Sequence, residues 1–229
     1  YLLTESYNQK ELYLYQNIFF DIKKMKMHVW DDQRGHLEIP YRKYAYVKDS
    51  NGQHVSLYGD RLKRVTQFDK DDPTLHESDV PPMTRFLVDQ YTDSDESSVG
   101  HRIMFFDIEV EVTEGFPDVQ KAQNPITSIA LYDSTTEKYY TYVFDPNKRL
   151  KTYTKDDQVV EIYETEYEML NKFFQKYLEI RPTIISGWNS EFFDIPYLYN
   201  RAVRILGPEV ANLLSPISQV IYSEYKKKH

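Results

Sequence analysis

The amino-acid composition changes abruptly near residue 100, and this change constrains the fold more than any other feature of the chain. Residues 92–98 contain only Thr, Asp, Ser and Glu, whereas positions 103–106 are four consecutive apolar residues. A polar stretch of this kind indicates a solvated linker, and a short apolar run is typical of a strand buried on both faces. We therefore predict two domains, residues 1–98 and residues 99–229.

The second domain is predicted to begin with a three-stranded meander. Two runs rich in β-branched and aromatic residues, 126–132 and 139–144, follow the first strand at 103–110. The polar residues 133–137 between these runs are typical of a turn. The three strands are therefore expected to pair in sequence order.

A helix, a short strand and a second helix are expected after the meander. Thr165 and Glu168 have the spacing of a capping box, and apolar positions recur behind them at helical intervals until Pro182. Residues 183–186 indicate a short buried strand, and Pro196 opens the last helix. This order of elements predicts an α/β domain with a sheet.

The first domain is predicted to be a smaller α+β unit. Four short apolar runs separated by polar clusters indicate an antiparallel sheet. They lie at 27–30, 44–47, 54–58 and 64–68. The pair Asn51-Gly52 predicts a tight hairpin turn, because both residue types tolerate positive φ angles. Pro81-Pro82 opens a helix that is expected to run through Tyr91.

Charge and cysteine content exclude several classes of protein. The 229 residues carry a net charge of −8 at pH 7 and contain no Cys, which excludes a disulfide framework and a thiolate zinc site. The acidity argues against a tight binder of duplex nucleic acid, although not against an enzyme whose metal ions meet the phosphates. No apolar run approaches the roughly 18 residues of a membrane span. We expect a cytoplasmic protein, in the host cytoplasm if it is of phage origin, with no membrane partner.

Two carboxylates stand at the end of the first strand of the second domain. Because side chains alternate along a strand, Asp107 and Glu109 project from one face, about 6–7 Å apart. Alone, such a pair is typical of an ordinary solvated strand face. Following a strand expected to be buried on both sides, however, these groups would be poorly solvated, and a divalent cation is the usual means of retaining their charge.

A third carboxylate, Asp194, lies where the predicted loop after residue 187 enters the last helix. Two interpretations of Asp194 stay open at this point. Aspartate is among the best helix N-caps, so Asp194 ahead of Ile195-Pro196 is suited to cap that helix. Alternatively, it joins Asp107 and Glu109 in one site.

The segments around these carboxylates resemble the exonuclease motifs of family B DNA polymerases. Residues 106–109, Phe-Asp-Ile-Glu, resemble the first motif, and residues 187–194, from Gly-Trp-Asn to Phe-Asp, resemble the second. Residues 116–118 and 215–217 are similar to the tailed-phage branch, and residues 39–47 loosely resemble the N-terminal domain of that family. The resemblance implies a ribonuclease H-like (DnaQ-like) α/β exonuclease domain with a mixed sheet, preceded by a smaller α+β N-terminal domain.

The resemblance also implies an activity and a cofactor. The chain would be the proofreading 3′–5′ exonuclease portion of a DNA-directed DNA polymerase, and would hydrolyse the 3′-terminal phosphodiester of single-stranded DNA. Asp107, Glu109 and Asp194 would hold two Mg²⁺ or Mn²⁺ ions, and these would activate water and stabilise the leaving oxygen.

Three residues are candidates for contact with the DNA. Phe116 is either a stacking residue at the terminal bases or a loop aromatic packed on its own domain, and base stacking on such a ring contributes about 1–3 kcal/mol. Asn189 either hydrogen-bonds a phosphate or braces the turn, and Phe193 is a further candidate contact. Trp188 is expected in the core.

The third exonuclease motif of the family, Tyr-x-x-x-Asp, is expected beyond the last residue, His229, as are the polymerase domains. We therefore expect a partner that is the remainder of the polymerase, in the same parent chain or as a second subunit. The alternative is a catalytically incomplete DNA-binding or assembly module of a split polymerase. A third possibility is an unrelated acidic interaction protein, in which the carboxylates are surface groups and a cap.

Overall fold

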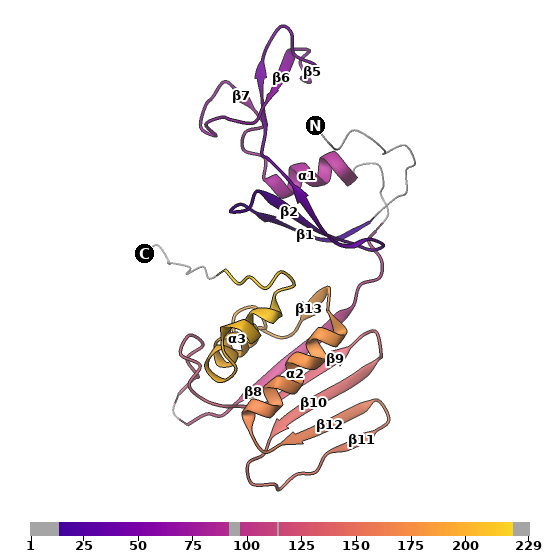
Figure 1. Cartoon of the computed structure of the whole chain (residues 1–229), viewed down its shortest axis with the longest axis vertical. Coiled ribbons are helices and arrows are strands. Elements are labelled where there is room, and N and C mark those ends of the chain that lie inside the picture. The colour runs from indigo at the N-terminus through magenta and orange to yellow at the C-terminus, as the bar shows by residue number, and fades with distance from the viewer. Residues whose placement is uncertain (1–13, 92–96, 114, 222–229) are drawn as a thin grey trace. The chain divides into compact units, whose positions relative to one another are not determined.

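The computed structural model describes residues 14–91, 97–113 and 115–221 and divides the chain into two compact units (Figure 1). The first unit is Tyr1–Gly100 and the second is His101–His229. The sequence-based expectation was a boundary two residues earlier, between residues 98 and 99. Most of the predicted linker, residues 92–96, lies outside the described residues.

The first unit contains two antiparallel sheets and one helix among its described residues. The three-stranded sheet has the order β1-β2-β3 and consists of β1 (Tyr15–Asp21), β2 (Lys26–Asp31) and β3 (Gly35–Pro40). The four-stranded sheet has the order β5-β6-β4-β7 and consists of β4 (Ala45–Lys48), β5 (His54–Val55), β6 (Arg61–Val65) and β7 (Leu75–His76). The prediction of a single sheet is therefore wrong, because only the run at 27–30 belongs to the first sheet and the other three runs belong to the second.

Helix α1 (Pro82–Tyr91) begins and ends where the sequence predicted. One face of the three-stranded sheet packs on this helix, with Met27 and Val29 of β2 fully buried beside Phe86 and Tyr41. Because side chains alternate along a strand, His28 and Trp30 of β2 project from the other face of the sheet.

The turn at Asn51-Gly52 differs from its prediction. Gly52 donates its backbone N–H to the Asp49 carbonyl at 2.8 Å, which closes a turn, but neither Asn51 nor Gly52 has a positive φ. Gly52 is required for another reason, since a Cβ there would overlap the backbone of Leu62. The turn also leads into β5, which pairs with β6 and not with β4, so the expected hairpin is wrong.

The second unit is built on a six-stranded mixed sheet with the order β11-β12-β10-β9-β8-β13. Its strands are β8 (Ile103–Val110), β9 (Ile126–Asp133), β10 (Lys138–Phe144), β11 (Tyr153–Lys155), β12 (Gln158–Tyr163) and β13 (Ile184–Ser186). The meander β8-β9-β10 is confirmed, as is the short strand β13, which pairs in parallel with β8. The sequence did not predict β11 and β12, which extend the far edge through a parallel pairing of β12 with β10.

Two longer helices pack on this sheet, and two short turns of helix follow them. They are α2 (Glu166–Ile180), α3 (Asp194–Ile205), α4 (Pro208–Ala211) and the 3-10 helix η1 (Asn212–Leu214). The predicted capping box is confirmed, because the backbone N–H of Glu168 donates to the Thr165 hydroxyl at 3.2 Å. Helix α2 ends at Ile180, and the next residue, Arg181, caps it in a left-handed conformation before Pro182.

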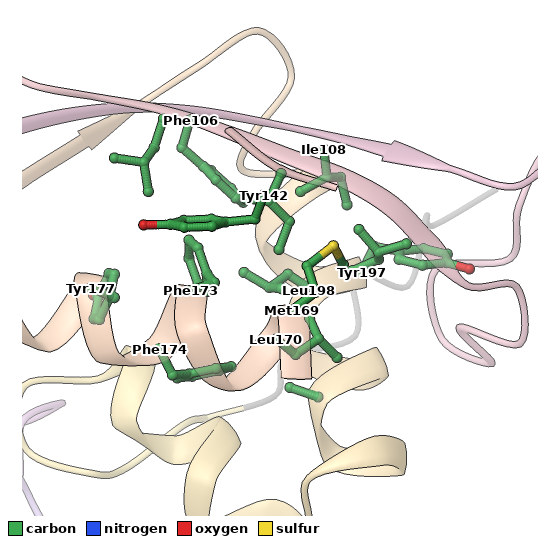
Figure 2. Packing of buried hydrophobic residues seen from close by; sticks show 14 of the residues in the cluster. Phe106, Ile108, Tyr142, Met169, Leu170, Phe173, Phe174, Tyr177, Tyr197 and Leu198 are labelled. Atoms are coloured by element: carbon green, nitrogen blue, oxygen red, sulfur yellow. The ribbon is translucent and has the colours of Figure 1, made fainter. Parts of the chain in front are cut away.

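The core of the second unit lies between the sheet and helices α2 and α3. Figure 2 shows Phe106, Ile108 and Tyr142 of the sheet directed toward the helices. Phe173 of α2 and Leu198 of α3 meet them there and are buried. Within the described residues, no helix combines the length and the apolar character needed to cross a membrane.

Candidate metal-binding site at the end of strand β8

Strand β8 presents two different faces at the point where the carboxylates stand. Phe106 and Ile108 point into the core, while Phe105, Asp107 and Glu109 alternate with them on the opposite face and are exposed. Phe105 is 49% exposed, so the prediction of a strand buried on both faces is wrong. Asp107 and Glu109 were expected to be poorly solvated for the same reason, and this expectation is also wrong. The helices cover only the side of β8 that carries Phe106 and Ile108.

Asp194 is the buried member of the three carboxylates and is only 3% exposed. It is the first residue of α3, and its Oδ1 accepts a hydrogen bond from the backbone N–H of Ile108 at 3.1 Å. Ile108 lies between Asp107 and Glu109, so this bond draws the carboxylate of Asp194 to the same stretch of β8. The N-cap position is Phe193, which makes no side-chain capping bond, so the interpretation of Asp194 as a simple cap is wrong.

Asp194 is buried within the electrostatic influence of Asp107 and Glu109. Burial raises the pKa of Asp194 above its ordinary value, and the charges of Asp107 and Glu109 raise it further, while the bond from Ile108 partly offsets them. In the described part of the chain, one set of three His, Asp or Glu side chains has its ligand atoms within 4.8 Å of one another, and it lies in the first unit. The oxygens of Asp107, Glu109 and Asp194 are therefore more widely spaced. The arrangement, called here the carboxylate site, is therefore open, with one buried and two exposed members.

The loop from Gly187 to Phe193 brings Asp194 to β8. Strand β13 pairs with β8 only as far as Ser186, opposite Phe105, and the chain then continues along the edge of β8. A Cβ at Gly187 would overlap the carbonyl oxygen of Phe106, so only glycine permits this approach. The edge of β8 that β13 leaves open is then occupied at Ile108 by the carboxylate of Asp194.

Asn189 shapes this loop through its backbone. It adopts a left-handed conformation with φ 56°, and its carbonyl accepts hydrogen bonds from the N–H groups of Phe192 and Phe193 at 3.1 and 3.0 Å. Asparagine tolerates this conformation better than most residues. The backbone of Asn189 thus closes the turn, and its side chain is exposed.

An aromatic hollow adjoins the carboxylate site. Its volume is about 420 Å³, and it is lined by Ile108, Glu109, Val110, Val112, Gly115, Phe116, Pro117 and Phe193. The rings of Phe116 and Phe193 lie with centroids 5.1 Å apart, and Phe116 is 79% exposed. Two of the three candidate DNA contacts thus come together beside Glu109, whereas Asn189 does not line the hollow.

Trp188 and Phe192 differ from what sequence reasoning indicated. Trp188 is 92% exposed, so its placement in the core is wrong, and Phe192, which the sequence did not single out, is 73% exposed. Both residues flank the turn at Asn189, where the chain lies along the edge of the sheet and the helices do not cover it. Large apolar side chains exposed side by side commonly mark a contact surface.

A buried ion pair holds α3, and therefore Asp194, in place. Arg201 of α3 donates to both carboxylate oxygens of Glu166, at 2.8 and 2.6 Å, and both side chains are buried. The same guanidinium donates to the carbonyls of Ala122 and Gln123, and Glu166 accepts the N–H of Ile126 at 2.8 Å. Sequence reasoning missed this pair, since its partners are 35 residues apart and neither stands in a recognisable spacing.

Fold and site together define an α/β domain that brings three carboxylates to the end of strand β8, beside a hollow that includes two phenylalanine rings. Residues 87–226 match the family described as DNA polymerase family B, exonuclease domain, and the chain belongs to this family. The family expected from the two motifs is confirmed.

Several curated relatives are DNA polymerases. The DNA-directed DNA polymerase of Escherichia phage RB69 is 32% identical over 136 residues, which cover 50% of this chain and 15% of that protein. The enzyme of Enterobacteria phage T4 is 33% identical over 136 residues, covering 49% and 15%. DNA polymerase 1 of Saccharolobus solfataricus is 30% identical over 193 residues, which cover 83% of this chain and 19% of the relative. The chain thus spans less than a fifth of these relatives.

Proposed function

We propose that the chain is the proofreading 3′–5′ exonuclease portion of a DNA polymerase, with a ribonuclease H-like second unit that shortens single-stranded DNA from its 3′ end. One observation carries this proposal: the buried carboxylate of Asp194 is fixed to the Ile108 N–H, directly between Asp107 and Glu109. Three carboxylates gathered on a rigid strand end and a helix start suit metal-dependent phosphodiester hydrolysis.

The ligand set fits hard divalent cations. Carboxylate oxygens are the ligands that Mg²⁺ and Mn²⁺ prefer, and no imidazole or thiolate is part of the carboxylate site. Burial raises the pKa of Asp194, and the negative charges of Asp107 and Glu109 raise it further. A bound cation would neutralise this negative charge. The open spacing of the three groups favours two ions over one.

Each residue of the site has a distinct part in this proposal. Bound cations would activate a water molecule and stabilise the leaving 3′ oxygen. Asp194, fixed by Ile108, holds its carboxylate in one orientation, while the exposed Asp107 and Glu109 have the freedom to follow the scissile phosphate. No Ser, His or Cys nucleophile is needed for such a reaction.

The aromatic hollow is the proposed seat of the terminal bases. Phe116 is exposed and touches Phe193, and Glu109 lines the same hollow, so a base stacked there lies next to the carboxylates. Stacking contributes about 1–3 kcal/mol per base without regard to sequence, which suits a proofreading enzyme. The exposed Asn189 is proposed to hydrogen-bond the DNA backbone.

The test is shortening of a 5′-labelled single strand by the purified chain as Mn²⁺ and then Mg²⁺ are added. Asp107→Ala is expected to abolish shortening. Asp157→Ala, which removes an exposed carboxylate from the turn between β11 and β12, is the matched control and is expected to retain it.

The same experiment separates the proposal from the alternative of a binding or assembly module. Such a module would bind Mn²⁺ and the labelled strand without shortening it, and addition of the remainder of the polymerase would then be needed for cleavage. Shortening that persists unchanged in Asp107→Ala would contradict the assignment of the site.

A further inference from the structure

A second cluster of potential metal ligands lies in the first unit, on strands β2 and β3. His28 stands directly opposite Glu38 in the register of the two strands, and Trp30 stands directly opposite His36. Because alternate residues of a strand share a face, these four side chains project from the same side of the sheet. That side is opposite to the one that packs Met27 and Val29 on α1.

The side chains converge closely. Nδ1 of His28 and Nε2 of His36 are 2.9 Å apart, and with a carboxylate oxygen of Glu38 all three ligand atoms lie within 4.8 Å of one another. The indole of Trp30 stacks on the ring of His36, with centroids 4.7 Å apart and an interplanar angle of 13°. The stack places the ring of His36 beside that of His28.

We propose that His28, His36 and Glu38, called here the hairpin site, bind a divalent transition-metal cation of the zinc class. Two imidazole nitrogens and one carboxylate oxygen form a ligand set that suits Zn²⁺, and imidazole is a poor ligand for Mg²⁺. Zinc-bound nitrogens in a tetrahedral site lie roughly 3.3–3.4 Å apart, so an ion would replace the hydrogen bond between Nδ1 of His28 and Nε2 of His36. The two rings would turn and separate by about 0.4–0.5 Å to direct both lone pairs at the ion. The exposed His36 is able to make this adjustment.

The hairpin site has one buried and two exposed members. The side chain of His28 is 2% exposed, whereas His36 and Glu38 are exposed.

Lys26 competes with a cation for Glu38. Its ammonium group lies 2.7 Å from Oε2 of Glu38, and the two side chains are 40% and 46% exposed. Exposed ion pairs of this kind contribute little to stability, so Glu38 can exchange Lys26 for a metal ion at small cost. Because the ligands come from both strands, a bound ion would link β2 to β3 and stabilise the first unit. This inference does not depend on the proposed nuclease function.

The experiment is a titration of chelator-treated chain with Zn²⁺, measured by competition with a chromophoric chelator. All chains carry Asp107→Ala, so that Zn²⁺ binding at the carboxylate site contributes less to the measured affinity. His36→Gln is expected to weaken zinc affinity by more than the roughly 10–100-fold that outer ligand partners contribute. His54→Gln, which removes another exposed histidine of the first unit, is the matched control and is expected to leave the affinity unchanged.

Two further measurements distinguish a ligand from a structural residue. Lys26→Met is expected to tighten zinc binding several-fold, because it removes the competing cation without touching a ligand. Zn²⁺ should raise the unfolding temperature of His54→Gln above its value in chelator, whereas the unfolding temperature of His36→Gln should be the same with Zn²⁺ and with chelator. Equal zinc affinity in His36→Gln and His54→Gln, or no measurable zinc binding by the control, would overturn the proposal.

Discussion

The carboxylate of Asp194 accepts a hydrogen bond from the backbone N–H of Ile108 at 3.1 Å, across 86 residues of sequence. The bond occupies the edge of β8 that β13 leaves open, and it joins the start of α3 to the strand that carries Asp107 and Glu109. One contact thus positions a carboxylate, closes a sheet edge and joins the start of a helix to a strand.

Asp194→Asn should separate charge from position. The amide keeps an oxygen that accepts the Ile108 N–H, so we expect the fold to be retained. Loss of the charge should reduce 3′ shortening by at least about 100-fold, since a metal ion contributes several kcal/mol to the transition state. Single-turnover rates at saturating Mn²⁺ would measure this. A rate within a few-fold of the unsubstituted chain would rule out Asp194 as a metal ligand.

The same substitution predicts a pH dependence of stability. The folded-state pKa of Asp194 is raised by burial and by its carboxylate neighbours, so the ionised group destabilises the fold above that pKa. The penalty is lost as the pH falls through the folded pKa and is absent below the unfolded one. In chelator, Asp194→Asn should therefore exceed the unsubstituted chain in unfolding free energy near neutral pH.

The difference between the two chains should shrink as the pH falls from about 7 to about 4. Urea unfolding of both chains across this range measures it, and the comparison cancels the titration of all other groups. A difference that grows toward low pH would show that the folded-state pKa of Asp194 is lowered instead.

Glu166→Gln tests the ion pair that holds α3. The substitution leaves the buried guanidinium of Arg201 without its charged partner, which typically costs about 3–5 kcal/mol of unfolding free energy. The matched control is Lys148→Met, which breaks the exposed pair between Lys148 and Glu164 and should cost about 0–1 kcal/mol. Equal losses measured by urea unfolding would mean that burial of the Glu166 pair is unimportant.

Sequence reasoning succeeded where the determining contacts are local. The capping box at Thr165 and the helical repeat behind it predicted α2, and strand alternation placed Asp107 and Glu109 on one face. It failed where distant contacts decide. The apolar run at 103–106 looks buried throughout, yet nothing in the sequence shows that helices cover only one face of it, or that Trp188 stays exposed.

The role of Asp194 shows the same limit. Its position before Ile195-Pro196 is equally suited to a cap and to a metal ligand, and the choice depends on Ile108, which is remote in sequence. Strands β11 and β12 also lack the alternation that marks a strand with one buried face. All three residues of β11 are exposed, and five of the six residues of β12 are half-buried.

Gly187→Ala should disturb the site without touching a ligand. The added Cβ would overlap the carbonyl oxygen of Phe106, so the loop must shift and carry Asp194 with it. We expect a loss of about 1–3 kcal/mol in unfolding free energy together with reduced shortening. Gly52→Ala is the control, because its Cβ would overlap Leu62 in the first unit. It should lower stability without lowering the rate per folded molecule, and parallel loss of activity in both variants would show a general effect of instability.

Phe116→Ala tests the aromatic hollow. The ring is 79% exposed and its described ring contact is with Phe193, so its removal should change the unfolding temperature little. If the terminal base stacks on it, single-strand binding should weaken by about 1–3 kcal/mol, or roughly 5- to 150-fold. Tyr58→Ala removes another exposed aromatic, 92% exposed in the first unit, and should leave binding unchanged. Fluorescence anisotropy of a labelled single strand, in Ca²⁺ to suppress cleavage, gives both affinities. Equal affinities for the two variants would mean that Phe116 is only a packing residue of its loop.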